Sequence, residues 1–548
     1  MKAFETELAT AGSQSGVRVY SLLGEAASHL VVRHGRSLLV DCHSAQMRRW
    51  LERRTLPLPE MILHTHVQPE HCREAGQFPV ARIQVHEELV ELASDRAAYE
   101  RASHTVWDNP ADWMNTLGRE KYGVAGAVTV FPPEVPLKVA GTFREGERLT
   151  WQDLVIEVIP LPGHSRHHVG FVLELAGKLL AVFTGDLLWH PAKLVNVYDL
   201  EINYGGTALA SLPPILRDLA RRPVQRYFPA TGPAIANGPT QALELADAID
   251  AYQNALTWRS GEFQPAPRVA YPRAGRYLQL HKGVYQIDNF GNCILLIDDS
   301  GRGLVFDPGP CDFESPTRVA DFHRDLDLFE RESGLRAIDL ALVTHIHGDH
   351  YDMVPELLKR YPGCRVGAWD LVARVIEAPW DYPYPALLPW YNLGFDHVAV
   401  DDVLTTEEPY RWHDTVIESV HLPGHCYCHA GYVLTFNGVR LAVTGDTVQS
   451  RGESDALSFI IANHSVPGEC AGQLKAYRTL LARDIDLNLG GHGSHFGSCR
   501  ELYRESVRRI EHAMPHLSRL VPGGNLDVAC LRPCLPHWSS LPGVAEGL

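Results

Sequence analysis

Short apolar runs alternate along the chain with longer segments in which apolar residues recur every three or four positions. Residues 340–343 form a run typical of a buried strand, and residues 353–358 follow it with helical spacing. Helical spacing also occurs at 471–481 and at 501–514, and the second of these is rich in Arg and Glu and therefore expected on a solvated outer surface. This alternation predicts an α/β protein whose sheets are covered by helices.

The pattern is repeated in the two halves of the chain. Residues 28–42 and 292–307 each have two β-rich runs around a Gly turn, and the second run leads to an Asp, Asp41 or Asp307. Residues 151–157 parallel 412–418 in the same way, since both begin with Trp and carry Asp two positions later. An ordered series of such pairs predicts a tandem duplication of one domain.

The repeat also indicates where the domains begin and end. A first copy is expected in residues 15–258 and a second copy in residues 268–520. The polar, Pro-containing segment 260–268 has the composition of a linker. The Pro-rich stretch after residue 520 is expected to be an extended tail.

Composition narrows the class of protein. Of 548 residues, 45% are hydrophobic and 21% are charged, which is typical of a globular chain of more than one domain. The net charge of −16 disfavours nucleic acid and anionic membranes as partners, because both require a cationic surface. No apolar run is long enough for a membrane span, and the acidic N-terminal residues lack the apolar segment of a signal peptide. Eleven scattered cysteines favour a reducing compartment, so we expect a cytoplasmic protein.

Candidate chemistry is concentrated directly after the apolar run at 340–343. His345, His347, Asp349 and His350 follow it within six positions, in a loop between the expected strand and the expected helix. Neutral imidazole is the commonest protein ligand for metals, and a neighbouring carboxylate suits a hard or borderline divalent cation. The loop therefore predicts a metal site at the carboxyl end of a strand.

This loop resembles the HxHxDH signature of the metallo-β-lactamase superfamily. Three motifs that accompany the signature in the family follow in the same order: Leu-Pro-Gly before His425, Thr-Gly before Asp446, and Gly-Gly before His492. The resemblance implies that each copy is an αββα sandwich, with two mixed sheets face to face, helices outside and the metals at one edge. It also implies that one ion is held by His345, His347 and His425, a second by Asp349, His350 and His492, and both by Asp446.

The same resemblance implies a reaction. Two divalent cations would share a water, lower its pKa toward neutrality and generate a bridging hydroxide that attacks an ester-type bond. Asp349 would act as the catalytic residue that orients this hydroxide and carries a proton to the leaving group. Zinc is the favoured ion, with iron or manganese as alternatives, because the ligand set suits all three. We therefore expect a dinuclear metal-dependent hydrolase of a small thioester, lactone or phosphodiester.

Two other functions are left open by the sequence. Diiron oxygenases and oxidases share the fold, although the flavodiiron pattern has a Glu where this chain has His347. Tandem tRNA-processing nucleases of the superfamily also pair an active second half with a decayed first half. The acidic net charge and the lack of a Gly-Pro-rich RNA-clamping arm make nucleic acid an unfavourable partner, so a small-molecule substrate is expected. The oligomeric state is not predicted.

The first copy departs from the ligand pattern. Gln68 stands where the second copy has His347, and a neutral amide is a poor ligand for a borderline cation. Ala-Thr-Gly at 230–232 replaces the motif of His492. A degenerate, largely structural first copy is therefore expected, although one ion could still bind to the ligand-type residues that are left. These are His66, Glu70, His71, His164 and Asp186.

Two further features lie beside the candidate site. Five aromatic residues and four prolines between 379 and 391 are interpreted either as a wall of the substrate pocket or as a contact with the first copy. The corresponding part of the first copy contains Trp107 and Trp113. His429 matches a position that supports the ligands in the family, and a packed histidine is the other interpretation.

Overall fold

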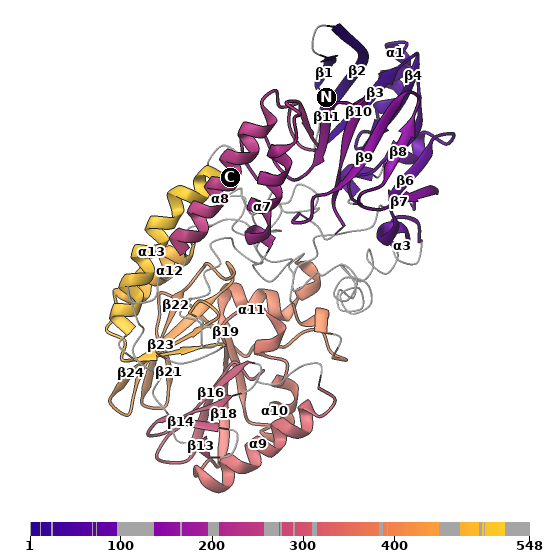
Figure 1. The fold of residues 1–548 in the computed structure, drawn as a ribbon. Coiled ribbons are helices and arrows are strands. Elements are labelled where there is room, and N and C mark those ends of the chain that lie inside the picture. Colours follow the sequence, from indigo (N-terminus) through magenta and orange to yellow (C-terminus); the bar gives the residue numbers. More distant parts are fainter. Residues whose placement is uncertain are drawn as a thin grey trace.

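The chain folds into two similar halves, shown in the computed structural model of Figure 1. The structure describes residues 2–520 except for 11–12, 24–25, 68, 73, 96–135, 165–166, 195–207, 257–272, 275–276, 289–290, 310–314, 383–386, 392, 449–471, 493–495 and 498. The predicted linker, the tail, Trp107 and Trp113 therefore lie outside the described residues.

In the first half, two sheets share one core. Among the described residues, one sheet has the strand order β1 to β7 and the other the order β12-β11-β10-β9-β8. Val31 and Leu63 from the first sheet and Val158 and Phe171 from the second lie in the core between them. The strands are β1 (Lys2–Thr10), β2 (Ser13–Leu23), β3 (Ala27–Arg33), β4 (Arg36–Val40), β5 (Pro59–Leu63), β6 (Arg82–His86), β7 (Val139–Phe143), β8 (Arg148–Trp151), β9 (Leu154–Pro160), β10 (Val169–Leu175), β11 (Lys178–Gly185) and β12 (Tyr227–Pro229).

The second half repeats this arrangement. Within the described residues, one sheet has the order β13 to β20 and the other the order β21 to β26. The strands are β13 (Arg273–Ala274), β14 (Tyr277–His281), β15 (Val284–Asp288), β16 (Asn292–Ile297), β17 (Arg302–Phe306), β18 (Ala337–Val343), β19 (Arg365–Trp369), β20 (Asp402–Leu404), β21 (Tyr410–Trp412), β22 (Thr415–His421), β23 (Ala430–Phe436), β24 (Val439–Gly445), β25 (Leu487–Gly490) and β26 (Phe496–Gly497).

Helices cover the outer faces of both sandwiches, which confirms the predicted tandem αββα fold (Figure 1). In the second half, Phe329 of α9 packs on one sheet and Tyr477 of α12 on the other. None of the described helices is long and apolar enough to cross a membrane. The helices are α1 (Met47–Arg53), α2 (Pro69–Cys72), α3 (Val90–Ser94), α7 (Ala208–Arg221), α8 (Gly238–Leu256), α9 (Arg318–Glu332), α10 (Val354–Arg360), α11 (Asp370–Glu377), α12 (Gly472–Leu481) and α13 (Cys499–Leu520), with short 3-10 turns at η1 (Ala75–Gln77), η2 (Glu87–Leu89), η4 (Gly348–His350), η5 (Pro379–Asp381) and η6 (Leu388–Tyr391).

Strand β16 shows why several strands are continuous apolar runs. Leu295 and Ile297 lie in the cluster that includes α9, whereas Ile294 and Leu296 lie in the core between the two sheets. Successive side chains of a strand point to opposite faces, and both faces of this sheet are covered. All residues of β16 are therefore buried.

Strand pairing follows the same order in the two halves, as expected for a duplicated domain. An antiparallel hairpin, β3–β4 or β16–β17, is followed by strands that pair in parallel, β4 to β7 or β17 to β20. Since parallel strands end at the same edge of a sheet, the loops after β5 and β18 occupy equivalent edges. The first sheet begins before the predicted boundary at residue 15, because β1 pairs along β2.

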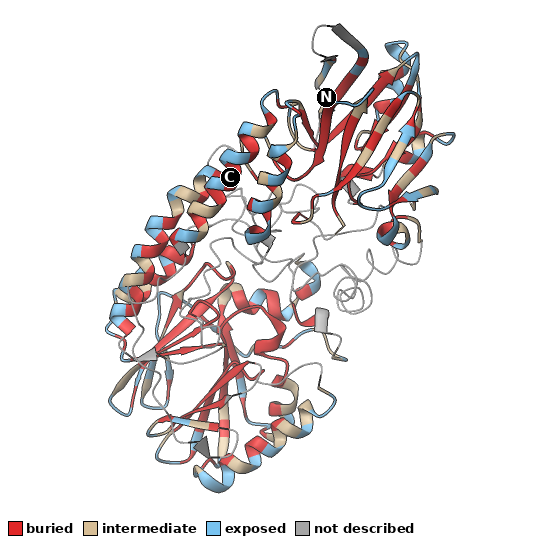
Figure 2. Cartoon of the chain, viewed as in Figure 1, coloured by how far each residue is buried: buried red, intermediate tan, exposed pale blue. Residues whose placement is uncertain are grey.

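The two halves contact each other through α8 and α13, which are the last described helices of the two copies (Figure 1). Leu517 and Leu520 of α13 are buried in the same cluster as α7 and α8. The backbone N–H of Leu194 also donates to the carbonyl oxygen of Leu520 over 2.8 Å. The expectation of a solvated outer helix at 501–514 was therefore wrong for one face of α13, because that face packs on α12 and α8 and is buried (Figure 2).

Candidate metal centre

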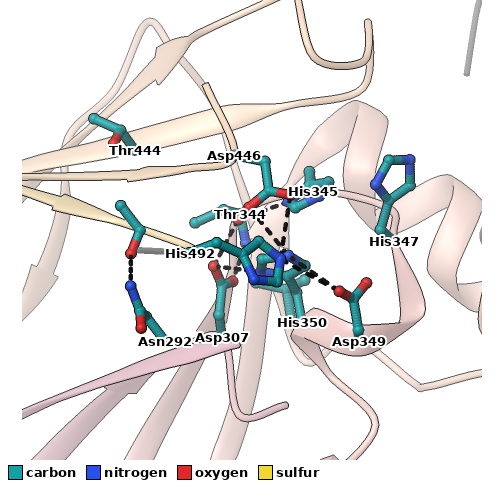
Figure 3. A network of polar contacts seen from close by, with 12 residues as sticks. Asn292, Asp307, Thr344, His345, His347, Asp349, His350, Thr444, Asp446 and His492 are labelled. Atoms are coloured by element: carbon teal, nitrogen blue, oxygen red, sulfur yellow. Dashed lines mark hydrogen bonds and ion pairs between the residues drawn. The ribbon is translucent and has the colours of Figure 1, made fainter. Parts of the chain in front are cut away.

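The HxHxDH loop begins where β18 ends. His345, His347, Asp349 and His350 are all buried there, and the last two lie in the 3-10 turn η4. This turn brings Asp349 and His350 next to His492 and Asp446 of the second sheet (Figure 3). The strand therefore delivers the whole loop to one edge of the sandwich.

The remaining predicted ligands come from the other sheet. His425 follows β22, Asp446 follows β24, and His492 follows β25, so each lies directly after the carboxyl end of a strand. Figure 3 shows Asp446 and His492 from this sheet facing His345, His350 and the HxHxDH loop. The structure thus brings together the predicted ligands of the second copy.

Four of these residues form a first group of potential ligands. His345, His347, His425 and Asp446 each place one ligand atom within 4.8 Å of the others. The Nε2 atoms of His345 and His425 lie 3.9 and 3.4 Å from Oδ2 of Asp446. Metal–ligand bonds of about 2 Å put two ligands of a tetrahedral ion roughly 3.3 Å apart, so these separations suit a shared cation.

The other three residues form a second group. The ligand atoms of Asp349, His350 and His492 also lie within 4.8 Å of one another. Asp446 contacts this group as well, since its Oδ1 lies 3.2 Å from Nε2 of His350 and its Oδ2 lies 3.5 Å from Nε2 of His492. The Asp446 carboxylate therefore stands between the two groups.

A buried hydroxyl fixes the tautomer of His345. The Thr344 hydroxyl donates to Oδ2 of Asp307 over 2.8 Å, so its oxygen accepts a hydrogen bond from Nδ1 of His345 at 3.0 Å. The lone pair of His345 then lies on Nε2, which is buried and has no hydrogen-bond partner within the described part of the chain. A ligand histidine needs this arrangement.

The same aspartate orients His350. Oδ2 of Asp307 lies 3.2 Å from Nδ1 of His350, which leaves Nε2 directed at Asp446 and Asp349. Asp307 and Thr344 were not among the residues predicted for the site. The repeat carried the signal, because both hairpins end in Asp and both HxHxDH-type loops are preceded by Thr.

Charges within the site are balanced by protons on histidines. Burial opposes protonation of His350, but Asp446 and Asp349 outweigh it and hold the pKa of His350 well above its usual range. Burial also opposes protonation of His492, yet Asp446 and Asp349 raise the pKa of His492 to about 9. Burial would raise the pKa of the Asp446 carboxyl, but His492 and His350 keep that pKa well below its usual range. These carboxylates stay ionised and attract positive charge to the site.

Two glycines permit the close packing around Asp446. A Cβ atom on Gly491 would lie 2.3 Å from Oδ1 of Asp446 and 2.6 Å from Cε1 of His350. A Cβ atom on Gly445, whose φ is +45°, would lie 2.5 Å from Oγ1 of Thr344. Both glycines of these motifs are therefore required by the close approach of the backbone to the ligands.

Supporting residues hold the ligand loops in place. His429 accepts a hydrogen bond at Nε2 from the backbone N–H of Asp446 over 3.2 Å and stacks on His345. Asn292 donates through its side chain to the carbonyl oxygen of Gly490 and through its backbone to that of Gly491, over 2.9 and 2.7 Å. His429 thus supports the ligands, as the sequence predicted. The supporting contacts of Asn292 were not predicted from the sequence.

The aromatic stretch lies next to the metal loop. Its 3-10 turn η6 packs on η4, and Leu388 within η6 is fully buried. Trp380 is 39% exposed and donates to Asp396 over 2.6 Å. Residues 383–386 and the side chains of Trp390 and Tyr391 lie outside the described residues, so the choice between a pocket wall and a contact with the first copy stays a prediction.

A third histidine group, in the first half, is explained without a metal. His86, Glu145 and His167 place ligand-type atoms within 4.8 Å of one another. The backbone N–H of Glu88 donates to Nδ1 of His86 over 3.2 Å, so the proton of His86 lies on Nε2, which is 3.0 Å from Oε2 of Glu145. This arrangement is a histidine–carboxylate ion-pair contact through Nε2.

Residues 287–512 match the family model described as the metallo-beta-lactamase superfamily. The second half of the chain belongs to this superfamily. The match includes every residue of the candidate metal centre, from His345 to His492. The predicted family is therefore confirmed by both the sequence match and the fold.

Similar proteins include several hydrolases. A hydroxyacylglutathione hydrolase of Aeromonas salmonicida (strain A449) is 30% identical over 161 residues, which are 29% of this chain and 48% of that protein. An atrochrysone carboxyl ACP thioesterase of Cryptosporiopsis sp. (strain 8999) is 24% identical over 229 residues, 40% of this chain and 58% of that protein. A metal-dependent hydrolase of Pyrococcus furiosus is 29% identical over 112 residues, 20% of this chain and 45% of that protein. The matches thus span about half the length of these superfamily relatives.

Solved structures of metallo-beta-lactamases are similar to part of the chain. A subclass B3 metallo-beta-lactamase of Bradyrhizobium japonicum is 18% identical, with a TM-score of 0.34, and the match covers 46% of this chain and 97% of that chain. A metallo-beta-lactamase of Legionella gormanii is 14% identical, with a TM-score of 0.34, over 45% of this chain and 98% of that chain.

Proposed function

We propose that the second half is a dinuclear metal-dependent hydrolase of a small thioester. The position of Asp446 carries this proposal, because its carboxylate contacts histidines of both ligand groups, at 3.4 Å from His425 and 3.2 Å from His350. A carboxylate between two sets of imidazoles is the arrangement that holds two cations next to each other.

The donor set fits two divalent cations. Nε2 of His345 is a buried polar atom that has no hydrogen-bond partner among the described residues, and the buried Nε2 of His350 and Oδ1 of Asp446 lie 3.2 Å from each other. Burying such atoms is costly unless a cation or a donor satisfies them. One ion would be held by His345, His347 and His425, the other by Asp349, His350 and His492, and Asp446 would bind both. Bound divalent cations supply Lewis acidity and lower the pKa of a coordinated water toward neutrality.

Asp349 is the residue that we assign to proton transfer. Burial would raise the pKa of its carboxyl, but His350 and His492 hold that pKa below its usual value. Asp349 therefore stays an anion at neutral pH, and the oxygen of its carboxylate that does not face His492 and His350 can accept a proton. A proton held there is available to a leaving group that enters the site.

Thioesters are the first substrate class to test. Two of the similar proteins are named as a hydroxyacylglutathione hydrolase and an acyl carrier protein thioesterase. Lactones and phosphodiesters come next, because an oxygen of either could be polarised by the same cations. Zinc is the favoured ion, and iron or manganese suits the same nitrogen and oxygen ligands.

The test combines metal content with hydrolysis in the full-length protein. Elemental analysis of the zinc-loaded proteins should show that Asp446→Ala holds about two ions per chain fewer than the wild type, because this carboxylate serves both ligand groups. Hydrolysis of a 2-hydroxyacyl glutathione thioester should disappear in the same variant. His512→Ala, which changes an exposed histidine of α13, is the matched control and should retain both properties.

Four outcomes would contradict the proposal. Full metal content in Asp446→Ala would refute the shared carboxylate. A zinc-loaded wild-type chain that hydrolyses no thioester, lactone or phosphodiester would refute the hydrolase. Protein isolated with bound iron and an oxygen-sensitive visible band would instead support the diiron oxygenase alternative, and cleavage of RNA alone would support the nuclease.

A further inference from the structure

We propose that the first half of the chain binds one divalent cation of its own, through His66, His164 and Asp186. These residues belong to the half of the chain that the superfamily match, at 287–512, does not include. The sequence favoured a largely structural first copy because Gln68 replaces a ligand histidine. The packing of the described residues changes this expectation.

The three side chains converge on one oxygen atom. Nε2 of His66 and Nε2 of His164 lie 3.8 and 3.7 Å from Oδ2 of Asp186. All three residues are buried, and their ligand atoms lie within 4.8 Å of one another. The corresponding distances in the second half, from His345 and His425 to Asp446, are 3.9 and 3.4 Å. The first half thus retains the spacing of a three-ligand site.

A hydroxyl fixes the tautomer of His66 as it does that of His345. The Thr65 hydroxyl donates to Oδ2 of Asp41 over 2.9 Å, and its oxygen lies 2.9 Å from Nδ1 of His66, from which it accepts. The lone pair of His66 consequently lies on Nε2, the atom that faces Asp186. Two electron-pair donors, a neutral imidazole nitrogen and a carboxylate oxygen, therefore face each other, and a cation between them would be attracted by both.

The Asp186 carboxylate is held so that one oxygen faces the histidines. The backbone N–H of Asp186 donates to Nε2 of His168 over 3.0 Å, and Nδ1 of His168 donates to the carbonyl oxygen of Leu161 over 2.8 Å. The Thr231 hydroxyl donates to Oδ1 of Asp186 over 2.8 Å. Oδ2 is left toward His66, His164 and His71.

Thr231 also explains why we infer one ion and not two. In the second half, His492 lies 3.5 Å from Oδ2 of Asp446, whereas Thr231 of the replaced Gly-Gly-His motif contacts the equivalent carboxylate. A threonine hydroxyl that donates its proton to Asp186 cannot replace the lone pair of an imidazole. The ligands of the second ion are therefore incomplete in the first half.

His71 contacts the same oxygen of Asp186 and therefore competes with a cation for it. Its Nε2 lies 2.9 Å from Oδ2 of Asp186, a distance at which a protonated imidazole forms an ion pair with the carboxylate. A cation at His66, His164 and Asp186 would have to compete with this contact for Oδ2 of Asp186. If the ion pair is the native state at every zinc concentration, the first half binds no ion.

The inferred ion would join the two sheets of the first half. His66 follows β5 of one sheet, whereas His164 and Asp186 follow β9 and β11 of the other. An ion bound to the folded state alone stabilises that state by mass action. Zinc should therefore raise the unfolding temperature of the first half.

The experiment compares zinc content in matched variants of the full-length protein after loading and gel filtration. His164 and His425 both follow Leu-Pro-Gly, so His164→Ala removes the first-half equivalent of a second-half ligand. We expect His164→Ala to lose about one zinc ion per chain relative to the wild type. His86→Ala, in the neighbouring histidine group, should lose none.

The inference would be overturned if His164→Ala kept the zinc content of the wild type. It would also be overturned if His86→Ala lost an ion and His164→Ala did not. Circular dichroism checks that each variant is folded. If His164→Ala fails to fold, Asp446→Ala gives the answer, because its first half is intact and should still carry about one zinc ion that raises its unfolding temperature. A zinc-free, folded Asp446→Ala protein would refute the first-half site.

Discussion

Oδ2 of Asp307 lies 3.2 Å from Nδ1 of His350 and also accepts the hydroxyl hydrogen bond of Thr344, which in turn orients His345. One buried carboxylate outside the HxHxDH loop therefore sets the tautomer of a histidine in each ligand group. Asp41 and Thr65 hold His66 through the same contacts in the first half.

Asp307→Asn should weaken metal binding in the second half. The amide nitrogen cannot accept the hydrogen bonds that the carboxylate accepts, so the histidine tautomers would no longer be fixed. Loss of such a supporting contact typically lowers metal affinity about 10–100-fold. Competition with a chelator measures the change, and Asp299→Asn, at an exposed aspartate, is the control. Equal affinities in the two variants would contradict the role of Asp307.

His347→Ala should abolish hydrolysis. This side chain is buried, and its Nδ1 lies 2.9 Å from Nε2 of His425, close enough for both to reach one cation. A lost ligand should cost more than a lost supporting contact, so we expect turnover to fall by at least about a hundredfold. Turnover of the thioester at saturating substrate and zinc is the measurement, beside His512→Ala. Activity close to that of the wild type would remove His347 from the site.

Leu517→Ala should destabilise the contact between the two halves. Leu517 of α13 is buried in the cluster formed by α7 and α8 of the first half. Truncation of a buried leucine costs about 2–5 kcal/mol. Thermal unfolding should therefore begin at a lower temperature, whereas Leu243→Ala, at an exposed leucine of α8, should have little effect. Identical unfolding curves for the two variants would show that the contact contributes nothing to stability.

His29 should make the protein less stable in acid. Its Nε2 donates to the carbonyl oxygen of Pro229, and burial lowers the pKa of His29 to about 4 although this hydrogen bond opposes the shift. Between about pH 6.5 and pH 4 the unfolded chain binds more protons at this position than the folded chain, so stability falls as pH falls. The difference between a pKa of 6.5 and one of about 4 corresponds to about 3 kcal/mol, since one pKa unit is worth about 1.4 kcal/mol.

Urea unfolding at pH 7.5 and at pH 5 measures this effect. The wild type should lose more stability between the two pH values than His29→Gln, which has no titrating group at this position. An equal loss in both proteins would assign the pH dependence to other histidines. His34→Gln, at an exposed histidine of the same hairpin, controls for the loss of an imidazole.

Local sequence was sufficient to locate each candidate ligand. His345, His425, Asp446 and His492 each lie in a short motif that follows a strand, and a strand, its turn and the residue after it are contiguous in the chain. The ordered repetition of these motifs predicted a duplicated domain, and their resemblance to the superfamily implied an αββα sandwich for each copy. Strand β16 shows the limit of this signal. All its residues are buried, and a continuous apolar run in the sequence does not indicate which elements pack on either face.

The amino-acid sequence by itself determined the superfamily, the duplicated fold and the residue types at the metal centre, because each of these is encoded in short contiguous motifs. Only the tertiary structure decided which atoms meet. It placed Asp307 against His350, Asn292 against Gly490, and α13 against α8, and it brought His66 and His164 to the same oxygen of Asp186. These contacts join residues that are far apart in the chain, so they depend on how the two sheets of each half pack together.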